Sequence, residues 1–192
     1  MKTMNGRKMT PDNSSMFIDD GVNLKDRVIH LFDEIDADSV GKVIRGIQLM
    51  LVANKEPIDI FINSFGGCPY SAWAVANFIT LQKDVLIRTH ALGAVMSAAT
   101  TVFLAGDEKL CYENSVFMFH TVSSGAEGKY TNELKDNYLE CQRIHEDMCE
   151  YYGKYTKTTS KEWMKLLKGN DLYIRPEQAV EMGIVDKIVV PV

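Results

Sequence analysis

The chain has 192 residues, of which 46% are hydrophobic and 24% charged, and its formal net charge at pH 7 is −5. These values predict one soluble globular domain that is long enough to bury a sizeable core. Because phosphate binding needs a basic surface, the acidic balance argues against nucleic acid as the main partner. No apolar run approaches the roughly 18 residues that a bilayer-spanning helix needs, so no membrane association is expected.

The N-terminal region and the cysteines bear on the compartment. Residues 1–15 are polar and lack the apolar core of a secretory signal, so we expect a mobile arm and a cytoplasmic or organellar protein. The four cysteines, Cys68, Cys111, Cys141 and Cys149, show no CxxC spacing and no histidine pair completes a metal pattern. We therefore expect no metal site, and interpret them as small buried or half-buried thiols rather than as a disulfide framework.

Strands alternate with helices through the first two thirds of the chain. Hydrophobic spacing predicts, in chain order, a strand over 27–32, a helix over 39–53, a strand over 58–63, a helix over 69–79, a strand over 85–89, a helix over 96–105, and strands over 109–112 and 116–119. This alternation is typical of βαβ units and of a mainly parallel sheet.

The chain changes character after about residue 130. A long, charged helix is expected over 131–152, with Gly153 as its stop. One face of this helix carries Leu134, Tyr138, Cys141, His145, Met148 and Tyr152. Thr159 and Glu162 form a capping box for a short helix, and a last helix over 176–182 precedes a final strand over 184–189.

Two short stretches carry the candidate chemistry. Gly66 and Gly67 follow a predicted strand, and Ser97 stands among small residues where a strand is expected to turn into a helix. A hydroxyl on such a turn is exposed, and a helix N-terminus favours a developing oxyanion, so Gly66, Gly67 and Ala98 are candidate N–H donors. Each stretch also has an ordinary interpretation, as a serine that bonds the helix backbone or as glycines that only supply positive φ.

A serine hydroxyl becomes a nucleophile when a base takes its proton and a carboxylate orients that base. His120, at the end of a buried strand, and Asp171, after a helix stop, are the candidates, although a core histidine and a turn aspartate are the plainer alternatives. His30 lies inside an early strand, His90 lies too close to the serine turn, and His145 lies on the charged helix.

At these residues the chain resembles the Clp protease proteolytic subunit, the ClpP family of serine peptidases. The similarity extends from about residue 24 to 186 and rests on Ile62-Asn63-Ser64-x-Gly66-Gly67, Thr89-x-x-Leu92-Gly93-x-x-x-Ser97-Ala98-Ala99-Thr100, Asn114-Ser115-x-x-Met118-x-His120 and Asp171. The resemblance implies that Ser97 is the nucleophile, His120 the base and Asp171 its orienting carboxylate. It also implies oxyanion donors at Gly67 and Ala98, and substrate binding at Gly66, Ser124 and Gly125.

The resemblance further implies an α/β fold, namely a ClpP/crotonase-like spiral of ββα units with a protruding handle helix. The handle region corresponds to about residues 123–153, and residues 1–15 correspond to axial pore loops. Homo-oligomeric heptameric rings, stacked as a tetradecamer, would enclose a chamber into which an AAA+ ATPase unfoldase threads polypeptides. No cofactor is implied for the subunit, and no phosphate loop of the G-x-x-x-x-G-K type is present.

The chain also departs from the family pattern near the candidate site. Phe65 stands where a proline is usual, Val95-Met96 replaces smaller residues before the serine, Thr121-Val122 replaces Gln-Pro, and Asp33-Glu34 stands where a glycine is common. The main interpretation is a serine endopeptidase that cleaves unfolded polypeptides through an acyl-enzyme. A non-catalytic ring subunit and an unfoldase-independent maturation protease are the alternatives, and a crotonase-type acyl-CoA enzyme fits less well because it does not call for this triad.

Overall fold

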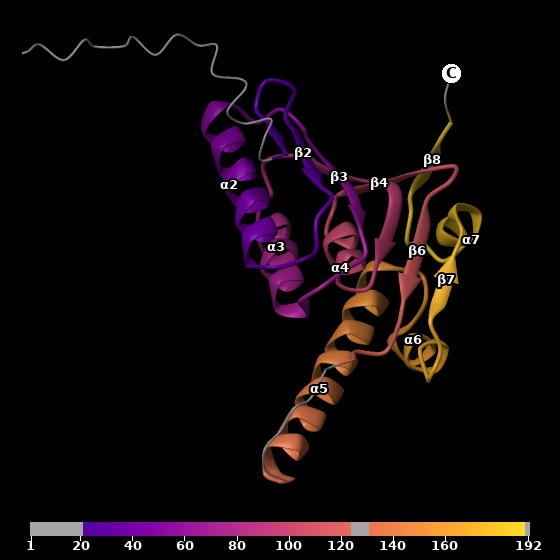
Figure 1. Cartoon of the computed structure of the whole chain (residues 1–192). Helices are drawn as coiled ribbons and strands as arrows, with labels where there is room; N and C mark the ends of the chain where they lie inside the picture. Colours follow the sequence, from indigo (N-terminus) through magenta and orange to yellow (C-terminus); the bar gives the residue numbers. More distant parts are fainter. Residues whose placement is uncertain (1–20, 124–130, 191–192) are drawn as a thin grey trace, which may run out of the picture.

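The computed structural model describes residues 21–123 and 131–190 (Figure 1). The predictions made for residues 1–15, Ser124 and Gly125 fall outside these residues. The described strands form one eight-stranded sheet with the order β1-β2-β3-β4-β5-β8, while β6 pairs with β4 and with β7. Their bounds are β1 Val22–Asn23, β2 Val28–Leu31, β3 Ile58–Ser64, β4 Ile87–Met96, β5 Glu108–Tyr112, β6 Val116–Phe119, β7 Leu172–Ile174 and β8 Lys187–Val189.

The sheet is mainly parallel, as predicted, with antiparallel pairing only between β1 and β2 and between β6 and β7 among the described strands. The strand predicted over 85–89 is much longer in the structure, because β4 has two successive partners. Its residues 88–91 pair with β5, and its residues 94–96 pair with β6. β4 changes partner around Gly93, between these two segments. The second half of β4 leads directly to Ser97.

Three helices follow the first parallel strands: α2 (Ala37–Ala53), α3 (Pro69–Thr80) and α4 (Ala98–Leu104). Ile58, Ile60 and Ile62 of β3 point into the core and are fully buried, whereas the alternate side chains of this strand are half-buried or exposed. This period of two is expected when only one face of the sheet is covered. α2, α3 and α4 lie together beside the strands (Figure 1).

α5 (Thr131–Tyr155) projects away from the sheet and packs against α6 (Ser160–Leu166), whereas α7 (Pro176–Glu181) lies beside β6 and β8 (Figure 1). The capping box predicted at Thr159 and Glu162 is present. The predicted stop at Gly153 is wrong, since the helix continues to Tyr155. A Cβ on Gly153 would lie 2.6 Å from the amide nitrogen of Ser160, so this glycine instead allows the close approach of the chain that enters α6.

The face predicted for the long helix is buried only at its C-terminal end. Met148 and Tyr152 are buried, whereas Leu134 and Tyr138 remain exposed. The outer half of α5 therefore has no apolar partner among the described residues. No helix in the described ranges has both the length and the apolar character to cross a bilayer.

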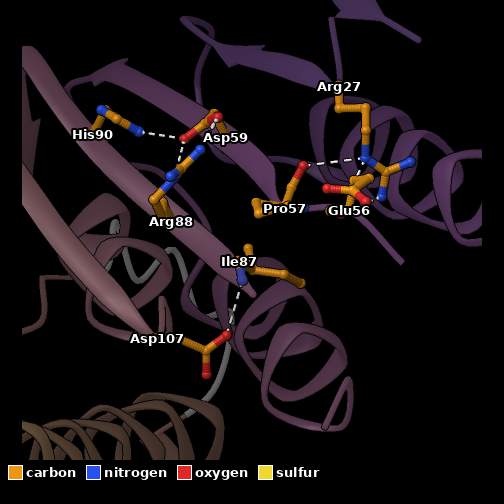
Figure 2. Close-up of polar contacts among 8 residues, drawn as sticks. All are labelled: Arg27, Glu56, Pro57, Asp59, Ile87, Arg88, His90 and Asp107. Atoms are coloured by element: carbon orange, nitrogen blue, oxygen red, sulfur yellow. Dashed lines mark hydrogen bonds and ion pairs between the residues drawn. The ribbon is translucent and has the colours of Figure 1, made fainter. Parts of the chain in front are cut away.

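Polar contacts tie the beginnings of the central strands together (Figure 2). The buried Arg27 guanidinium donates hydrogen bonds to the carbonyl oxygens of Glu56 and Pro57, with Nη2 2.7 Å from the Glu56 oxygen and Nε 3.1 Å from each. The amide of Ile87 donates to the Asp107 carboxylate at 2.9 Å. These bonds hold the loops that enter β3 and β4, and so set the position of both strands that lead to the site.

The half-exposed face of the sheet carries an ion cluster beside stacked rings. Asp59 accepts a forked pair of bonds from Arg88, at 2.6 and 2.7 Å, and lies 2.7 Å from His90 Nε2 (Figure 2). Burial opposes ionisation of Asp59, but the bonds from Arg88 and His90 outweigh it and lower the pKa of the carboxyl. The His90 ring stacks on Phe61 at 4.3 Å, so this histidine belongs to the sheet face.

Candidate active site

Ser97 lies at the junction of β4 and α4 in a strained backbone conformation. Its φ of 52° and ψ of −127° are unusual for a residue with a side chain. Hydrogen bonds hold the turn, because the Ser97 amide donates to the Met118 carbonyl at 2.8 Å and its own carbonyl accepts from Thr100 Oγ1 at 2.6 Å. The prediction that the serine marks a strand-to-helix turn is confirmed.

His120 meets Ser97 because β4 and β6 run in parallel and end at the same edge of the sheet. Met96 pairs with Met118, and each candidate residue follows shortly after. The distance from Ser97 Oγ to His120 Nε2 is 2.7 Å. In the neutral tautomer with Nδ1 protonated, Nε2 accepts the hydroxyl proton, which is the geometry that a general base requires.

Asp171 is placed next to His120 by strand register, but it does not bond to it. β6 and β7 are antiparallel with Phe119 opposite Leu172, so the next pair outward is His120 and Asp171. Asp171 is exposed, and no hydrogen bond joins its carboxylate to the imidazole in the structure. The role of Asp171 as orienting carboxylate thus stays a prediction.

Gly66 must be a glycine because the serine turn occupies the space that a side chain would fill. A Cβ on Gly66 would lie 2.6 Å from the Cβ of Ser97 and 2.8 Å from the Met96 carbonyl oxygen. Its φ of +104° also favours glycine. The glycine pair is therefore more than a turn, since Gly66 permits direct contact between the β3–α3 loop and Ser97.

Two backbone N–H groups near Ser97, those of Gly67 and Ala98, are left unused by the local backbone hydrogen bonds. Ile35 forms a parallel bridge around Gly67, using the Gly66 carbonyl (2.8 Å) and the Cys68 amide (2.7 Å), so the bridge leaves the Gly67 N–H unused. Ala98 is the first residue of α4, where an N–H has no acceptor within the helix. Both predicted donors are thus available to an external oxygen.

These groups share one cavity of about 90 Å³, which is lined by Gly67, Pro69, Ser97, Ala98, His120, Val122, Ser123 and Met148. The sequence analysis did not assign Pro69 or Met148 to the site. Pro69 begins α3, and Met148 arrives from α5, more than fifty residues along the chain from Ser97. Met148 lines the cavity because α5 packs against α4. A contact between helices so far apart in the chain cannot be predicted from local sequence pattern.

The competing histidines do not reach Ser97. His30 stacks near Phe61 on the sheet face, and His90 bonds to Asp59. His145 lies on α5, where burial lowers its pKa, and its Nδ1 has no hydrogen-bond partner among the described residues. Of the four, His120 alone hydrogen-bonds the serine hydroxyl.

Two of the unusual residues beside the site, Val95 and Thr121, do not line the cavity. Val95 is fully buried in the core, so its bulk is directed away from the cavity. Thr121 Oγ1 donates a hydrogen bond of 2.6 Å to the Leu167 carbonyl oxygen, which anchors the segment after His120 to the end of α6. This bond restrains the backbone where a proline would otherwise do so.

All four cysteines are free, and Cys111, Cys141 and Cys149 are buried or half-buried as predicted. The same interpretation is wrong for Cys68, which is the N-cap residue of α3 and is exposed. Within the described ranges, no three or more His, Cys, Asp or Glu side chains gather as metal ligands would.

The fold and the site can now be compared with known proteins. The structure of a ClpP1 variant from Listeria monocytogenes has the same fold, with a TM-score of 0.78 and 22% identity, over 86% of this chain and 92% of that one. The fold class is thus that of ClpP, a spiral α/β domain with a protruding helix.

The sequence comparisons agree with the fold. The Clp protease family model matches residues 14–192, so the chain belongs to the Clp protease family. The ATP-dependent Clp protease proteolytic subunit of Deinococcus radiodurans is 25% identical over 171 residues, which cover 86% of this chain and 81% of that protein. This chain is a divergent member of the family.

Proposed function

We propose that this protein is a serine endopeptidase, the proteolytic subunit of a self-compartmentalising protease that hydrolyses unfolded polypeptides. One observation carries the proposal: Ser97 Oγ lies 2.7 Å from His120 Nε2, in a cavity that two backbone N–H donors also line. Nucleophile, base and oxyanion donors are the three parts that acyl transfer from a peptide needs.

The reaction follows from the positions of these groups. Ser97 Oγ attacks the peptide carbonyl carbon while His120 Nε2 takes the hydroxyl proton, and the Gly67 and Ala98 N–H groups stabilise the resulting oxyanion. His120 then donates the proton to the departing amine, which leaves an acyl-enzyme on Ser97. Water, activated by His120, hydrolyses this ester. Asp171 orients the imidazole and stabilises its charged form.

Substrate alignment is assigned to the backbone around the cavity. The Gly66 backbone borders the nucleophile, because a Cβ there would contact Ser97. Ser124 and Gly125 are assigned to peptide binding on the strength of the family resemblance. The side chains of Val122 and Met148 line the same cavity and would meet the substrate.

Assembly and supply of substrate complete the proposal. We assign to the chain homo-oligomeric heptameric rings, stacked in pairs through α5, and an AAA+ ATPase unfoldase that feeds the chamber, in the cytoplasm or an organelle. The exposed apolar side chains of Leu134, Tyr138 and Leu139 on the outer half of α5 support ring pairing, because apolar surface of this kind is usually covered by a partner.

The test combines labelling with hydrolysis. A fluorophosphonate should label wild-type protein at Ser97, and Ser97→Ala should abolish both labelling and cleavage of unfolded casein while the mass of the assembly in solution stays the same. Unlabelled wild type, or cleavage retained in Ser97→Ala, would contradict the assignment. Comparison of casein cleavage with and without an added ATPase separates an unfoldase-fed enzyme from an autonomous maturation protease.

A non-catalytic ring subunit is the second candidate function. The observation that favours it is the missing bond between Asp171 and His120, together with the exposure of Asp171. A scaffold of this kind would assemble normally and would show no serine labelling in the assembled state. The labelling experiment therefore decides between the two.

A further inference from the structure

A second hollow shares Gly67 with the Ser97 cavity. It is lined by Phe32, Asp33, Glu34, Phe65, Gly66 and Gly67, and its volume of about 310 Å³ exceeds the 90 Å³ of the cavity around the nucleophile. A polypeptide that presents a carbonyl to Ser97 runs past Gly67, so a side chain near the scissile bond can enter this hollow.

Hydrogen bonds hold the base of the hollow in place. Ser64 Oγ donates to the Asp33 carbonyl oxygen at 2.6 Å and accepts from the Gly66 amide at 3.2 Å, which joins the end of β3 to the loop after β2. A Cβ on Gly67 would lie 2.9 Å from Glu34 Cγ, so the Glu34 side chain packs directly against this proposed oxyanion donor. The hollow is thus a built feature of the site.

The chemistry of the lining suits a cation. The carboxylates of Asp33 and Glu34 have no ion-pair or hydrogen-bond partner among the residues that the structure describes. Phe32 and Phe65 expose 48% and 77% of their surfaces beside them. A guanidinium or ammonium group gains both from a carboxylate and from an aromatic face, and a guanidinium can use the two at once.

We propose that this hollow binds an arginine or lysine side chain of the polypeptide substrate, and that the enzyme prefers a basic residue next to the bond it cleaves. The inference rests on the proposed peptidase function and adds a specificity site to it. Glu34 determines the preference most directly because it touches Gly67, and Asp33 adds charge at the same wall.

Matched peptides test the preference in the assembled protein. The peptides differ only in carrying arginine, lysine, norleucine or glutamate at one position on either side of the cleaved bond. At one of the two positions that flank the cleaved bond, arginine should raise kcat/KM about fivefold to tenfold over norleucine. Glu34→Gln should remove most of this ratio, because kcat/KM should fall much more for the arginine peptide than for the norleucine peptide, and Glu34→Lys should favour glutamate instead. Glu113→Gln, in the exposed turn after β5, serves as the matched control and should retain the ratio.

The outcomes separate the specificity site from the proposed function. Equal kcat/KM values for all peptides, or an arginine preference retained in Glu34→Gln, would overturn the inference while leaving the peptidase intact. If no peptide is cleaved at all, the proposed function fails, and binding to the Ser97→Ala protein by fluorescence anisotropy decides the inference: the arginine peptide should bind more tightly, and Glu34→Gln should abolish the difference. A changed assembly mass in Glu34→Gln would mark the hollow as a subunit contact and would also overturn it.

Discussion

Around Ser97 the chain is buried or half-buried and its backbone is hydrogen-bonded on both sides, whereas around Asp171 the chain is mostly exposed and the carboxylate has no bond to His120. The first and last residues of the candidate triad thus differ in how firmly hydrogen bonds within the single chain hold them in place. Ser97 is held by a parallel strand pair, a helix start and the close contact of Gly66.

This difference indicates which parts of the candidate site are preorganised. Strain at a nucleophile persists only when surrounding bonds determine it, and the bonds to Met118 and Thr100 do so at Ser97. Asp171 depends instead on the three-residue antiparallel pairing of β6 with β7. For Asp171 to orient the imidazole, as we propose, its carboxylate must move closer to His120 when substrate binds or the protein assembles.

The largest effect that tests this comparison is expected from Asp171→Asn. Loss of the orienting carboxylate should lower kcat about 10³-fold or more, because the imidazole loses its preferred tautomer and the partner of its charged form. Steady-state hydrolysis of a fluorogenic peptide measures it, with Asp84→Asn in an exposed turn as the control. A fall of less than tenfold would show that Ser97 and His120 work as a dyad.

Gly66→Ala should reduce kcat by about 10²- to 10³-fold, the size of losing one oxyanion donor. The new methyl group would meet Ser97 Cβ and backbone atoms of Met96 and Ala98, so the turn must shift. Gly183→Ala is the matched control, since it also has positive φ (72°) and a crowded Cβ, but outside the site. It should lower stability and leave the kcat of folded protein unchanged. Equal loss of kcat in both variants would contradict a local role for Gly66.

Tyr152→Phe tests the C-terminal end of α5, which packs on the rest of the domain. There the buried Tyr152 hydroxyl accepts a hydrogen bond of 3.1 Å from Thr100 Oγ1 of α4. Burial raises the pKa of Tyr152 to about 12, so the hydroxyl stays neutral over the working range. Its removal should cost about 1 kcal/mol in the free energy of unfolding, measured with urea. Tyr138→Phe, on the exposed half of the helix, should cost less than the measurement error, and similar losses in both would refute the contrast.

The smallest effect is expected at Glu140, on the exposed half of α5. The hydrogen bond from Arg143, and then that from Tyr70, lower the pKa of this carboxyl to about 2 from an ordinary 4.5. Because the folded pKa is depressed, the stabilisation is present above about pH 4.5 and is lost as the pH falls toward 2. The stability difference between wild type and Glu140→Gln should therefore be small and should vanish over this window.

Urea unfolding at several pH values measures this difference, and Glu150→Gln provides an exposed control on the same helix. The effect stays small because exposed ion pairs are screened by water and salt. A difference that grows as the pH falls would contradict the assignment of the interaction to ionised Glu140.

Local pattern in the chain predicted more of the fold than of the site. The alternation of strands and helices, the parallel sheet and the capping box at Thr159 all appear in the structure, because period and capping depend on residues close in sequence. The predicted helix stop at Gly153 was wrong because this glycine allows the close approach of Ser160 and does not end the helix. The length of β4 failed because its second half is stabilised by β6, a partner that sequence spacing does not reveal.

Sequence alone determined which residues are chemically able to act: a serine on a small-residue turn, a histidine after a strand, an aspartate before one and a glycine pair. The tertiary structure decided what they do together. Strand register brought His120 to 2.7 Å from Ser97 and left Asp171 beside it without a bond, and loop packing put Glu34 against Gly67. Distances of this kind depend on contacts between segments far apart in the chain, which no local pattern specifies.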